Sequence, residues 1–533
     1  MTTSPFSSSQ PSARWRAGLA ITAVVSGFAA LTVLVFLVRA NGPVAANWPL
    51  TWELDYVDNS VLFAFARDVF TGAPLDWHFS PQVYFFPEIP ISLLAYALSG
   101  GELLWYYVVS AALNNALLLL VLIWCVKTLW PQQSWGGVLA RATCAGLPLL
   151  ILPWLAHSTS KIVSFHIGQP LLFHLGPNYY IGIYLLAFTV PVALAASSKR
   201  KRILALVLYA MTAACDPLLV ALTAPAIALI ALRVWRYSGW SACKRLILPG
   251  TVAVGVAAAI YLLAFRATGL AANSITDGYM FSLRRAGGAI GGVLLGLVEL
   301  FLQTPPLALV IVGSWVVIGR LCWVGWHDPA MLTTPDGHAR LYLALMPLSG
   351  YTAMIVLLAA HFWYSWLLLV GAIVSALLLA LPDKAVKLSV IVGYGLTTLI
   401  LIAQLLLQDQ TSPYFTYSNP VARCFDQQLP AGSSYCTGTQ GCRALSVQAH
   451  ADWNLIQLAH PGLGVSFWLE NVAPAYDDQP IHTLVVVPAE FAADEVKGLV
   501  ESRFGAPNLM QTCSGTTAEI WTYPFDLKEI VNS

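Results

Sequence analysis

Residues 47–68 of this chain read NWPLTWELDYVDNSVLFAFARD and place acids and aromatic residues directly after a long apolar run. That run, Ala17–Val38, has no charged residue and is long enough to cross a bilayer as one helix. It is too long for the core of a secretion signal and follows Arg14 and Arg16, so we predict a retained first span with a cytoplasmic N-terminus. The acidic stretch then opens the first loop on the outer face of a membrane.

The composition predicts the same setting. The chain has 533 residues, of which 58% are hydrophobic and 10% are charged, and its mean hydropathy is +0.69. Soluble proteins carry roughly a quarter charged residues, so we interpret the chain as an integral membrane protein. A net charge of +1 provides no basic face for nucleic acid, and we predict no nucleic-acid partner.

Basic residues in the short loops predict the orientation, because Lys and Arg are retained on the cytoplasmic side. The apolar stretch Ile203–Leu232 has basic loops at both ends, is longer than one span needs and is interrupted by Cys215-Asp216-Pro217. We therefore predict a hairpin of two spans with Asp216 near the outer face. The basic residues that mark the three cytoplasmic loops are Lys127, Arg141, Lys199, Arg200, Lys201, Arg202, Arg233, Arg236, Lys244 and Arg245.

The expected fold class is an all-α polytopic membrane protein with about eleven transmembrane helices and a small C-terminal α+β domain outside the cytoplasm. The stretch Ala289–Gly319 contains Pro305-Pro306 and is either one kinked span or two short ones. An odd number of spans places the C-terminus outside. Apart from the first span and the hairpin, spans are predicted at Leu103–Val126, Val138–Ala156, Tyr179–Ala196, Leu246–Phe265, Ala289–Gly319, Leu341–Ala359, Phe362–Leu381 and Leu388–Leu407.

The pattern divides the chain into three regions. Residues 1–16 are Ser-rich and are expected to form a disordered cytoplasmic N-terminus. Residues 17–407 form the transmembrane domain, with an outer loop at 39–102. Residues 408–533 form a hydrophilic tail that is long enough for one compact domain.

The tail carries the signals of a small α+β domain. We predict strands at Ile481–Val487 and Ala518–Tyr523 and an amphipathic helix at Ala492–Phe504 that ends at Gly505. An even set of cysteines in an outward-facing tail predicts disulfides, with a connectivity that the sequence leaves open; unrelated free thiols are the other interpretation. These cysteines are Cys424, Cys436, Cys442 and Cys513.

The outer loop at 39–102 gathers carboxylates, which are costly at a membrane face unless water, a partner or a metal compensates them. Asp55 and Asp58 would share one face of a helical turn, and Asp58 is also suited to cap a helix predicted at Ser60–Phe70. Glu88 lies in a stiff proline-flanked segment, where it is either a second functional acid or an ordinary interfacial glutamate. The acids of the loop are Glu53, Asp55, Asp58, Asp68, Asp76 and Glu88.

This arrangement resembles the GT-C superfamily of membrane glycosyltransferases. The resemblance is carried by a cytoplasmic N-terminus, many spans, a soluble C-terminal domain, and acids just after the first span in Glu53-Leu54-Asp55-Tyr56-Val57-Asp58 and Pro87-Glu88. It implies a GT-C-like fold that uses a lipid-phosphate-linked sugar outside the cytoplasm. It also implies that an acid of the first outer loop acts as a base or binds a metal. The subfamily is not assigned.

The chemistry of such a transfer needs a carboxylate to accept the acceptor's proton, and positive charge or a metal to stabilise the departing phosphate. We predict Asp58 as the base, with Asp55 and Glu88 as further catalytic candidates. The residues predicted to bind substrate, some of them the fork-shaped arginines that suit phosphate, are Arg266, Arg284, Arg285, Lys161 and His174.

The arginines have an ordinary alternative, which is contact with lipid headgroups. His174 belongs to a cluster with His157 and His166 whose spacing matches no standard ligand set, so we predict no histidine metal site. A divalent cation, Mg²⁺ or Mn²⁺, held by acids is the one cofactor that stays open.

The expected enzyme is a hexosyl or pentosyl transferase of a bacterial cytoplasmic (inner) membrane, with its tail in the periplasm or outside the cell. Its partners would be a polyprenyl-phosphate-linked sugar donor, a glycan, lipid or protein acceptor, and membrane lipids. The rival function is a transporter or lipid-linked glycan flippase, which would bind substrate by charges within the spans, where Glu299 is the main one. A polymerase with a diphosphate-linked donor would rely on Arg284, Arg285 and an outer histidine instead of Asp58.

Overall fold

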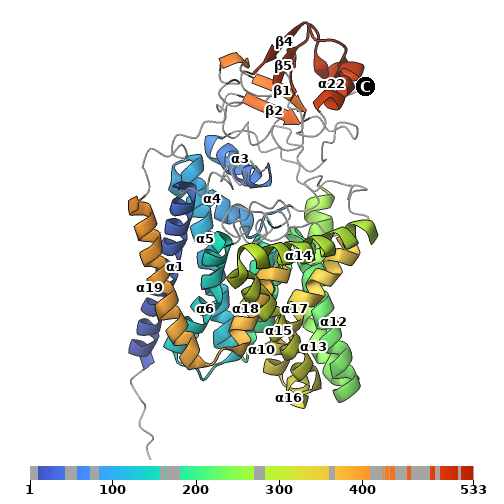
Figure 1. Ribbon diagram of the computed structural model, residues 1–533. Helices are drawn as coiled ribbons and strands as arrows, with labels where there is room; N and C mark the ends of the chain where they lie inside the picture. The colour runs from blue at the N-terminus through green and yellow to red at the C-terminus, as the bar shows by residue number, and fades with distance from the viewer. Residues whose placement is uncertain are drawn as a thin grey trace, which may run out of the picture.

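The chain forms a bundle of long helices with a small sheet domain beyond one end, as seen in a computed structural model (Figure 1). The structure describes residues 10–41, 57–72, 83–155, 163, 181–268, 283–358, 367–407, 424, 427–430, 432–437, 453–457, 480–486, 493–513 and 518–531. Within these residues, 8 helices are long and apolar enough to cross a membrane. The all-α polytopic class is confirmed, and the total of about eleven spans stays a prediction.

The bundle is built from helices of very different length. Eight contain the candidate spans, while others, including α4, α9 and α10, are too short to cross alone. In chain order they are α1 (Gln10–Asn41), α3 (Val57–Thr71), α4 (Glu88–Ser99), α5 (Leu103–Leu129), α6 (Trp135–Leu155), α9 (Ile181–Ala187), α10 (Val190–Ala195), α11 (Lys199–Cys215), α12 (Leu218–Ser238), α13 (Trp240–Ile260), η4 (Tyr261–Arg266), α14 (Leu283–Gln303), α15 (Pro305–His327), α16 (Pro329–Thr333), α17 (Pro335–Leu358), η7 (Leu367–Gly371), α18 (Ala372–Ala380) and α19 (Asp383–Leu407).

Three helix boundaries bear on the sequence-based expectations. Helix α1 begins at Gln10, so the last residues of the segment predicted to be disordered are helical; Pro11 suits the first turn, where its missing N–H is not needed. The predicted hairpin is interrupted where expected, between α11 and α12 at Asp216-Pro217. The stretch Ala289–Gly319 is two helices, α14 and α15, which are separated at Thr304 because Pro305 cannot continue a helix.

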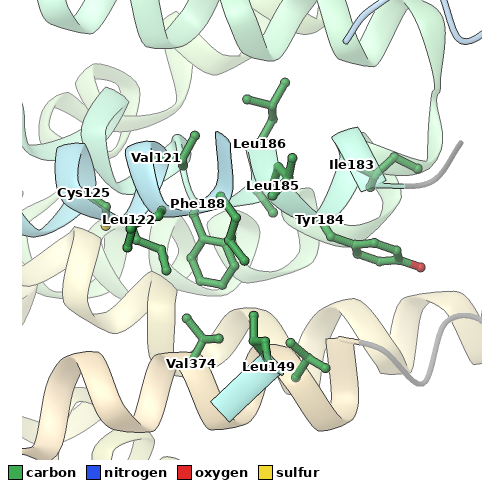
Figure 2. Packing of buried hydrophobic residues seen from close by; sticks show 14 of the residues in the cluster. Val121, Leu122, Cys125, Leu149, Ile183, Tyr184, Leu185, Leu186, Phe188 and Val374 are labelled. Carbon is green, nitrogen blue, oxygen red and sulfur yellow. The ribbon is translucent and has the colours of Figure 1, made fainter. Parts of the chain in front are cut away.

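The core lies where α5, α6, α9 and α18 meet. Figure 2 shows Val121 and Leu122 of α5 beside Phe188, with Leu149 of α6 and Val374 of α18 on the opposite side. All five side chains belong to one buried apolar cluster. Helices within a bilayer gain little from leaving lipid, so close van der Waals packing of this kind holds them together.

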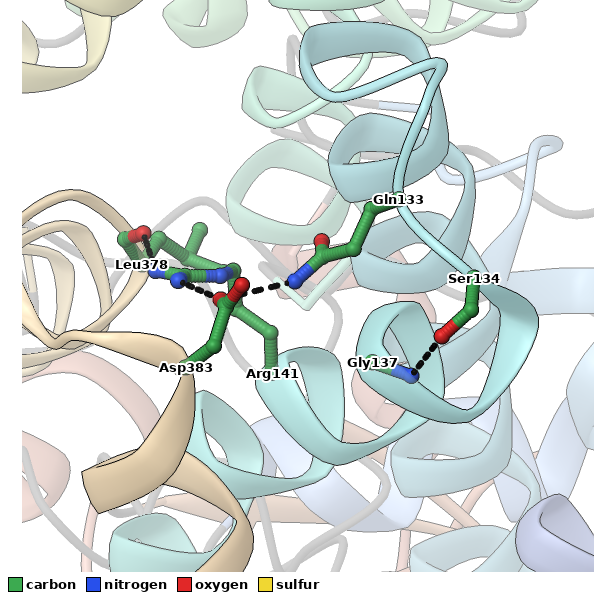
Figure 3. Close-up of polar contacts among 6 residues, drawn as sticks. All are labelled: Gln133, Ser134, Gly137, Arg141, Leu378 and Asp383. Atoms are coloured by element: carbon green, nitrogen blue, oxygen red, sulfur yellow. Dashed lines mark hydrogen bonds and ion pairs between the residues drawn. The ribbon is translucent and has the colours of Figure 1, made fainter.

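A set of polar contacts joins three helices at the end of the bundle opposite α4. The buried guanidinium of Arg141 donates to the Leu378 carbonyl at 2.8 Å and to the Asp383 carboxylate at 2.6 Å, and Gln133 Nε2 donates to the same carboxylate at 2.9 Å (Figure 3). Arg141 also stacks over the Trp130 ring, with 4.9 Å from Cζ to the ring centroid. These contacts join α6 to α18 and α19, and they fix the register of the bundle at this end.

The C-terminal domain is a mixed sheet with helices, as the sequence predicted for the tail. Its strands are ordered β2-β1-β3-β5-β4, with β1 parallel to β2 and β3, and β5 antiparallel to β3 and β4. The predicted strands correspond to β3 and β5, and the predicted helix is α22, which ends before Gly505 at φ 79°. The elements are β1 (Gly432–Thr437), β2 (Trp453–Gln457), β3 (Thr483–Val486), α22 (Ala493–Phe504), β4 (Leu509–Thr512), β5 (Glu519–Thr522) and α23 (Leu527–Val531).

Cysteines cross-link this domain as expected. Cys424 and Cys513 form a disulfide with 5.6 Å between their Cα atoms, across 89 residues of chain. Cys436 is disulfide-bonded as well, and its partner lies outside the described residues. The disulfide ties the start of the domain to the end of β4, so the edge of the sheet cannot separate from the rest without breaking it.

Replacing both Cys424 and Cys513 by serine should destabilise the tail domain by about 2–5 kcal/mol, because a cross-link over a long loop limits the unfolded chain. We expect faster proteolysis of the tail in the double variant, while the helical bundle stays intact on gels. The control is Cys243→Ser, at a buried free thiol of α13. Equal cleavage rates for the tail in wild type and double variant would contradict this expectation.

Candidate functional site

Four segments that are far apart in the sequence meet around the start of α4. The Val83 N–H donates to the Cys215 carbonyl at 3.0 Å, which ties the segment before α4 to the end of α11. The Gly182 N–H donates to Glu88 Oε1 at 2.9 Å, which ties α4 to α9. The Phe85 and Phe265 rings stack with centroids 5.5 Å apart, which brings in η4. We call this junction the α4 site.

Glu88 is the first residue of α4 and is buried, with 4% of its surface exposed. Burial raises the pKa of its carboxyl group well above the usual range, and the charge of Asp216 raises it further. Backbone N–H groups, among them that of Gly182, oppose the rise by binding the carboxylate. The carboxyl group of Glu88 is thus buried and hydrogen-bonded, unlike that of an ordinary interfacial glutamate.

Asp216 is the second buried carboxyl group of the α4 site. It lies between α11 and α12, is 3% exposed, and accepts a hydrogen bond from the Leu218 N–H through Oδ1 at 2.9 Å. Its other oxygen, Oδ2, has no hydrogen-bond partner within the described residues. Burial raises the pKa of Asp216 to about 7. Two such groups that interact in one buried place do not both ionise readily at neutral pH.

The backbone before α4 adopts an unusual conformation. Tyr84 has a φ of 51°, in the left-handed region that non-glycine residues rarely occupy, and its side chain is buried. The Ile89 N–H donates to the Tyr84 carbonyl at 3.1 Å. A conformation of this kind costs about 1–3 kcal/mol and persists when its surroundings fix it. Here the tether of Val83 and the packing of Tyr84 hold the turn that presents Glu88.

Gly182 is required by the close approach of α9 to α4. A Cβ atom at this position would collide with the ring of Pro87 and with Glu88 Oε1. The proline ring is rigid, and a shift of Glu88 Oε1 away from residue 182 would break the Gly182–Glu88 hydrogen bond. The absence of a side chain at residue 182 is therefore a condition of the junction.

Helix α3 carries the predicted base, Asp58, and is fixed to α4 and α5. Ser92 Oγ donates to the Leu62 carbonyl at 2.7 Å and shares a hydrogen bond of 2.7 Å with the Tyr106 hydroxyl. The Phe63 ring lies edge-on to Tyr106 at 5.0 Å between centroids. Because α3 begins at Val57, Asp58 lies inside its first turn instead of before it.

The predicted phosphate-binding residues are partly described. Arg266 ends η4, directly after the Phe265 ring that stacks on Phe85, and its side chain is exposed and makes no ion pair with the described residues. Arg284 is exposed in the first turn of α14. The structure thus brings Glu88, Asp216 and the segment of Arg266 to one end of the bundle. The side chains of Asp58 and Arg285, and the whole of Asp55, Lys161 and His174, lie outside the described residues.

Sequence reasoning did not assign a role to Asp216 or Gly182. The available signal for Asp216 was a lone acid at the break of an apolar hairpin, and it correctly indicated the turn.

Within the described residues no group of three or more His, Cys, Asp or Glu side chains could hold a metal ion. Glu88 and Asp216 alone are fewer ligands than Mg²⁺ or Mn²⁺ normally takes from oxygen donors.

The chain was compared with known proteins. No family model and no curated protein matches it. Among solved structures, ArnT from Cupriavidus metallidurans bound to undecaprenyl phosphate has a TM-score of 0.48 at 13% identity, covering 92% of this chain and 97% of that one. The same protein in the apo state has a TM-score of 0.48 at 12% identity, covering 90% and 96%.

An oligosaccharyltransferase from Archaeoglobus fulgidus, in complex with Zn and sulfate, has a TM-score of 0.40 at 12% identity, covering 94% of this chain and 73% of that one. These likenesses concern the fold alone. At TM-scores below 0.5 they carry no argument about the family or the chemistry of this chain.

The Gly182→Ala variant tests the junction. Its methyl group would meet Pro87 and Glu88, so we expect a loss of about 1–3 kcal/mol in stability, as for overpacked cores, and a lower thermal midpoint in detergent. The control is Gly136→Ala in α6, where a Cβ atom meets nothing within 4 Å. That variant should be neutral or slightly stabilising. Equal midpoints for the two variants would show that α4 and α9 do not touch at residue 182.

The Asp216→Asn variant tests the buried acid. Because the folded-state pKa is raised to about 7 from the ordinary 3.8, the folded protein binds the extra proton and loses stability as pH rises between these values. The cost above pH 7 is about 4 kcal/mol. Asparagine keeps the acceptor for the Leu218 N–H and cannot ionise, so the variant should gain in thermal midpoint relative to wild type at pH 8 and not at pH 4. Parallel profiles of the two proteins over this range would contradict the burial of Asp216.

Proposed function

We propose that this protein is a membrane glycosyltransferase that transfers a sugar from a polyprenyl-phosphate-linked donor to an acceptor on the outer face of a bacterial inner membrane. The observation that carries the proposal is the α4 site, where buried carboxyl groups from two parts of the chain lie beside a segment that ends in the exposed Arg266. Acids and an exposed cation at one end of an apolar bundle suit a substrate that combines a sugar, a phosphate and a lipid.

The transfer forms one bond and breaks one. The acceptor hydroxyl oxygen bonds to the anomeric carbon, its proton passes to a carboxylate, and the bond from the anomeric carbon to the phosphate oxygen breaks with its electron pair going to the phosphate. The base must be ionised beforehand, and the first turn of α3 suits this requirement because a helix N-terminus stabilises negative charge. This supports Asp58 as the base, with Asp55 next to the same turn.

Glu88 suits a positioning role better than that of the base. One of its oxygens is already bonded to Gly182, and burial raises its pKa, so it holds a proton at neutral pH more readily than it accepts one from an acceptor. With Asp216 it fixes α4, and α4 in turn supports α3 through Ser92. Arg266 would bind the donor phosphate, with Arg284, Arg285, Lys161 and His174 as further candidates.

The transfer as written does not depend on a divalent cation. If Mg²⁺ or Mn²⁺ takes part, it would supply charge for the departing phosphate. Glu88 and Asp216 would hold it only after losing their protons and together with further oxygen ligands. The acceptor class, whether glycan, lipid or protein, and the choice between hexose and pentose are left open by these residues.

We also propose that the C-terminal domain lies on the same outer side as α3, in keeping with its disulfides and with its place in Figure 1.

A transporter or flippase is less well supported. Such proteins bind their substrates near the middle of the membrane, at polar groups of the spans. Within the described part of the bundle, the buried charged side chains are Glu88, Arg141 and Asp216, and each lies at or near a helix end. Glu299, the main charge that the sequence offered, lies in α14 and is half-buried.

The decisive experiment is lipid and glycan profiling of cells that carry Asp58→Asn, Asp55→Asn or Glu88→Gln as the sole copy. Loss of the base should lower the transfer rate by about 10²–10⁴-fold, with a truncated glycan and an accumulating lipid-linked sugar. Glu88→Gln should lower activity less, because the amide oxygen can still accept the hydrogen bond from the Gly182 N–H.

The matched control is Asp68→Asn, which removes an acid of the same helix that is already paired with Arg67 at 3.4 Å. It should leave the glycan profile unchanged. Unchanged glycans in all four variants at normal protein levels would refute the assignment as a transferase with an acid of the first outer loop as base.

A further inference from the structure

Cations gather at the end of the bundle opposite the α4 site. Lys199, Arg200 and Lys201 form the first turn of α11, Arg236 lies in the last turn of α12, and Lys244 lies near the start of α13. All five side chains are exposed. We call them the basic patch. Two exposed indole rings lie in the same segment of chain, those of Trp235 and Trp240.

The fold brings these residues together. Helix α12 turns into α13 at Gly239, whose φ of 80° allows a sharp reversal, and α11 turns into α12 at the other end of the bundle. The start of α11, the end of α12 and the start of α13 are therefore neighbours, since α13 packs against both other helices. Figure 1 shows the lower ends of α12 and α13 side by side and far from α4.

Within the described residues, no acid balances the charge of the basic patch by an ion pair. Residues 196–202 and 233–245 contain no Asp or Glu, and none of the five side chains forms an ion pair within the described residues. Arginines elsewhere at this end are engaged. Arg141 pairs with Asp383, and Arg233 donates to the Trp326 carbonyl at 3.3 Å and lies over its ring.

Without a bound anion, the cations in the first turn of α11 are in an electrostatically unfavourable position. A helix N-terminus carries partial positive charge, so it repels cations in its first turn. Lys199, Arg200 and Lys201 occupy that turn, and no acid is present in it. A bound anion would relieve both the repulsion among the side chains and that with the helix end.

Apolar side chains continue from the basic patch along the same helices. Leu204, Val207 and Met211 lie one turn apart on α11, and each has 40–52% of its surface exposed. On α13 the exposed residues at the same spacing include Leu248 and Val252. Since α11 and α13 pack together, a hydrocarbon chain can lie along these residues with its headgroup at the cations.

We propose that the basic patch and the adjoining apolar faces of α11 and α13 bind an anionic phospholipid. The phosphate would accept hydrogen bonds from the lysines and arginines, the indole rings would lie at headgroup depth, and the acyl chains would follow the two helices. The inference is independent of the proposed transferase activity. It assigns a lipid partner to the face of the bundle that the reaction does not use.

Native mass spectrometry of the detergent-solubilised full chain tests the proposal, with phosphatidylglycerol and phosphatidylcholine of identical acyl chains as the probes. Wild type should retain phosphatidylglycerol in preference to phosphatidylcholine. The Arg236→Gln, Lys244→Gln double variant should bind phosphatidylglycerol on the order of tenfold more weakly, because each cation near a lipid surface contributes to the attraction. Its binding of phosphatidylcholine should not change.

The control removes the same number of charges from the same end of the bundle. Lys384 and Lys387 are exposed on α19, and the double change to Gln should leave phosphatidylglycerol binding within about twofold of wild type, since these side chains are outside the basic patch. An equal loss in this control would overturn the proposal, as would equal retention of the two lipids by wild type.

A second pair excludes misfolding as the cause. Lys199→Gln with Lys201→Gln removes cations from the first turn of α11, which favours the helix dipole, so the variant should be at least as stable as wild type. It should nevertheless lose phosphatidylglycerol binding to a similar extent. A stable variant with wild-type binding would show that the lipid does not lie on α11.

Discussion

The contact between the buried carboxyl group of Glu88 and the N–H of Gly182 is the constraint on which the outer end of the bundle depends. A carboxyl group taken out of water costs several kcal/mol unless it is bonded or neutralised. Here the N–H supplies a bond, and burial together with Asp216 favours the protonated form. Helix α4 can therefore begin against α9 only if residue 182 has no side chain and if the turn at Asp216 stays in place. The Glu88–Gly182 contact therefore links the positions of α4, α9 and the turn at Asp216.

This constraint explains why the candidate site is made from helix ends. The candidate spans carry few charged residues within their apolar windows, as hydrocarbon requires, so polar chemistry has to be assembled where helices begin and finish. Around Glu88 the pieces are the start of α4, the start of α9, the turn after α11 and the end of η4. Helix α3 rests on α4 and α5 through Ser92 and Phe63, which gives the first turn of α3 a fixed support.

Much of the fold could be predicted because its signals are local. Apolar runs indicated the spans, Asp216-Pro217 indicated the break of the hairpin, and Gly505 indicated the end of α22. The helix at 57–71 was expected with a later start, because its first turn lacks apolar periodicity. The site was predicted less well. Glu88 was identified from its proline-flanked place, but its bond to Gly182 crosses 94 residues, and no local pattern encodes a pairing over that distance.

The two ends of the bundle differ in their charged residues, and this difference bears on the orientation of the chain in the membrane. At the end with Lys199 and Lys244, exposed cations are numerous, and residues 196–202 and 233–245 contain no acid, which suits the cytoplasmic side of a membrane with anionic lipids. At the α4 site Glu88 and Asp216 are both buried, and Arg266 is exposed and forms no ion pair within the described residues. On the function proposed above, Arg266 would lie on the side where cations are disfavoured, and the phosphate of a lipid-linked donor would be its partner. The segment of Arg266 is also held beside Glu88 by the Phe85–Phe265 stack, so such a phosphate would bind next to the acids and not elsewhere on the outer surface.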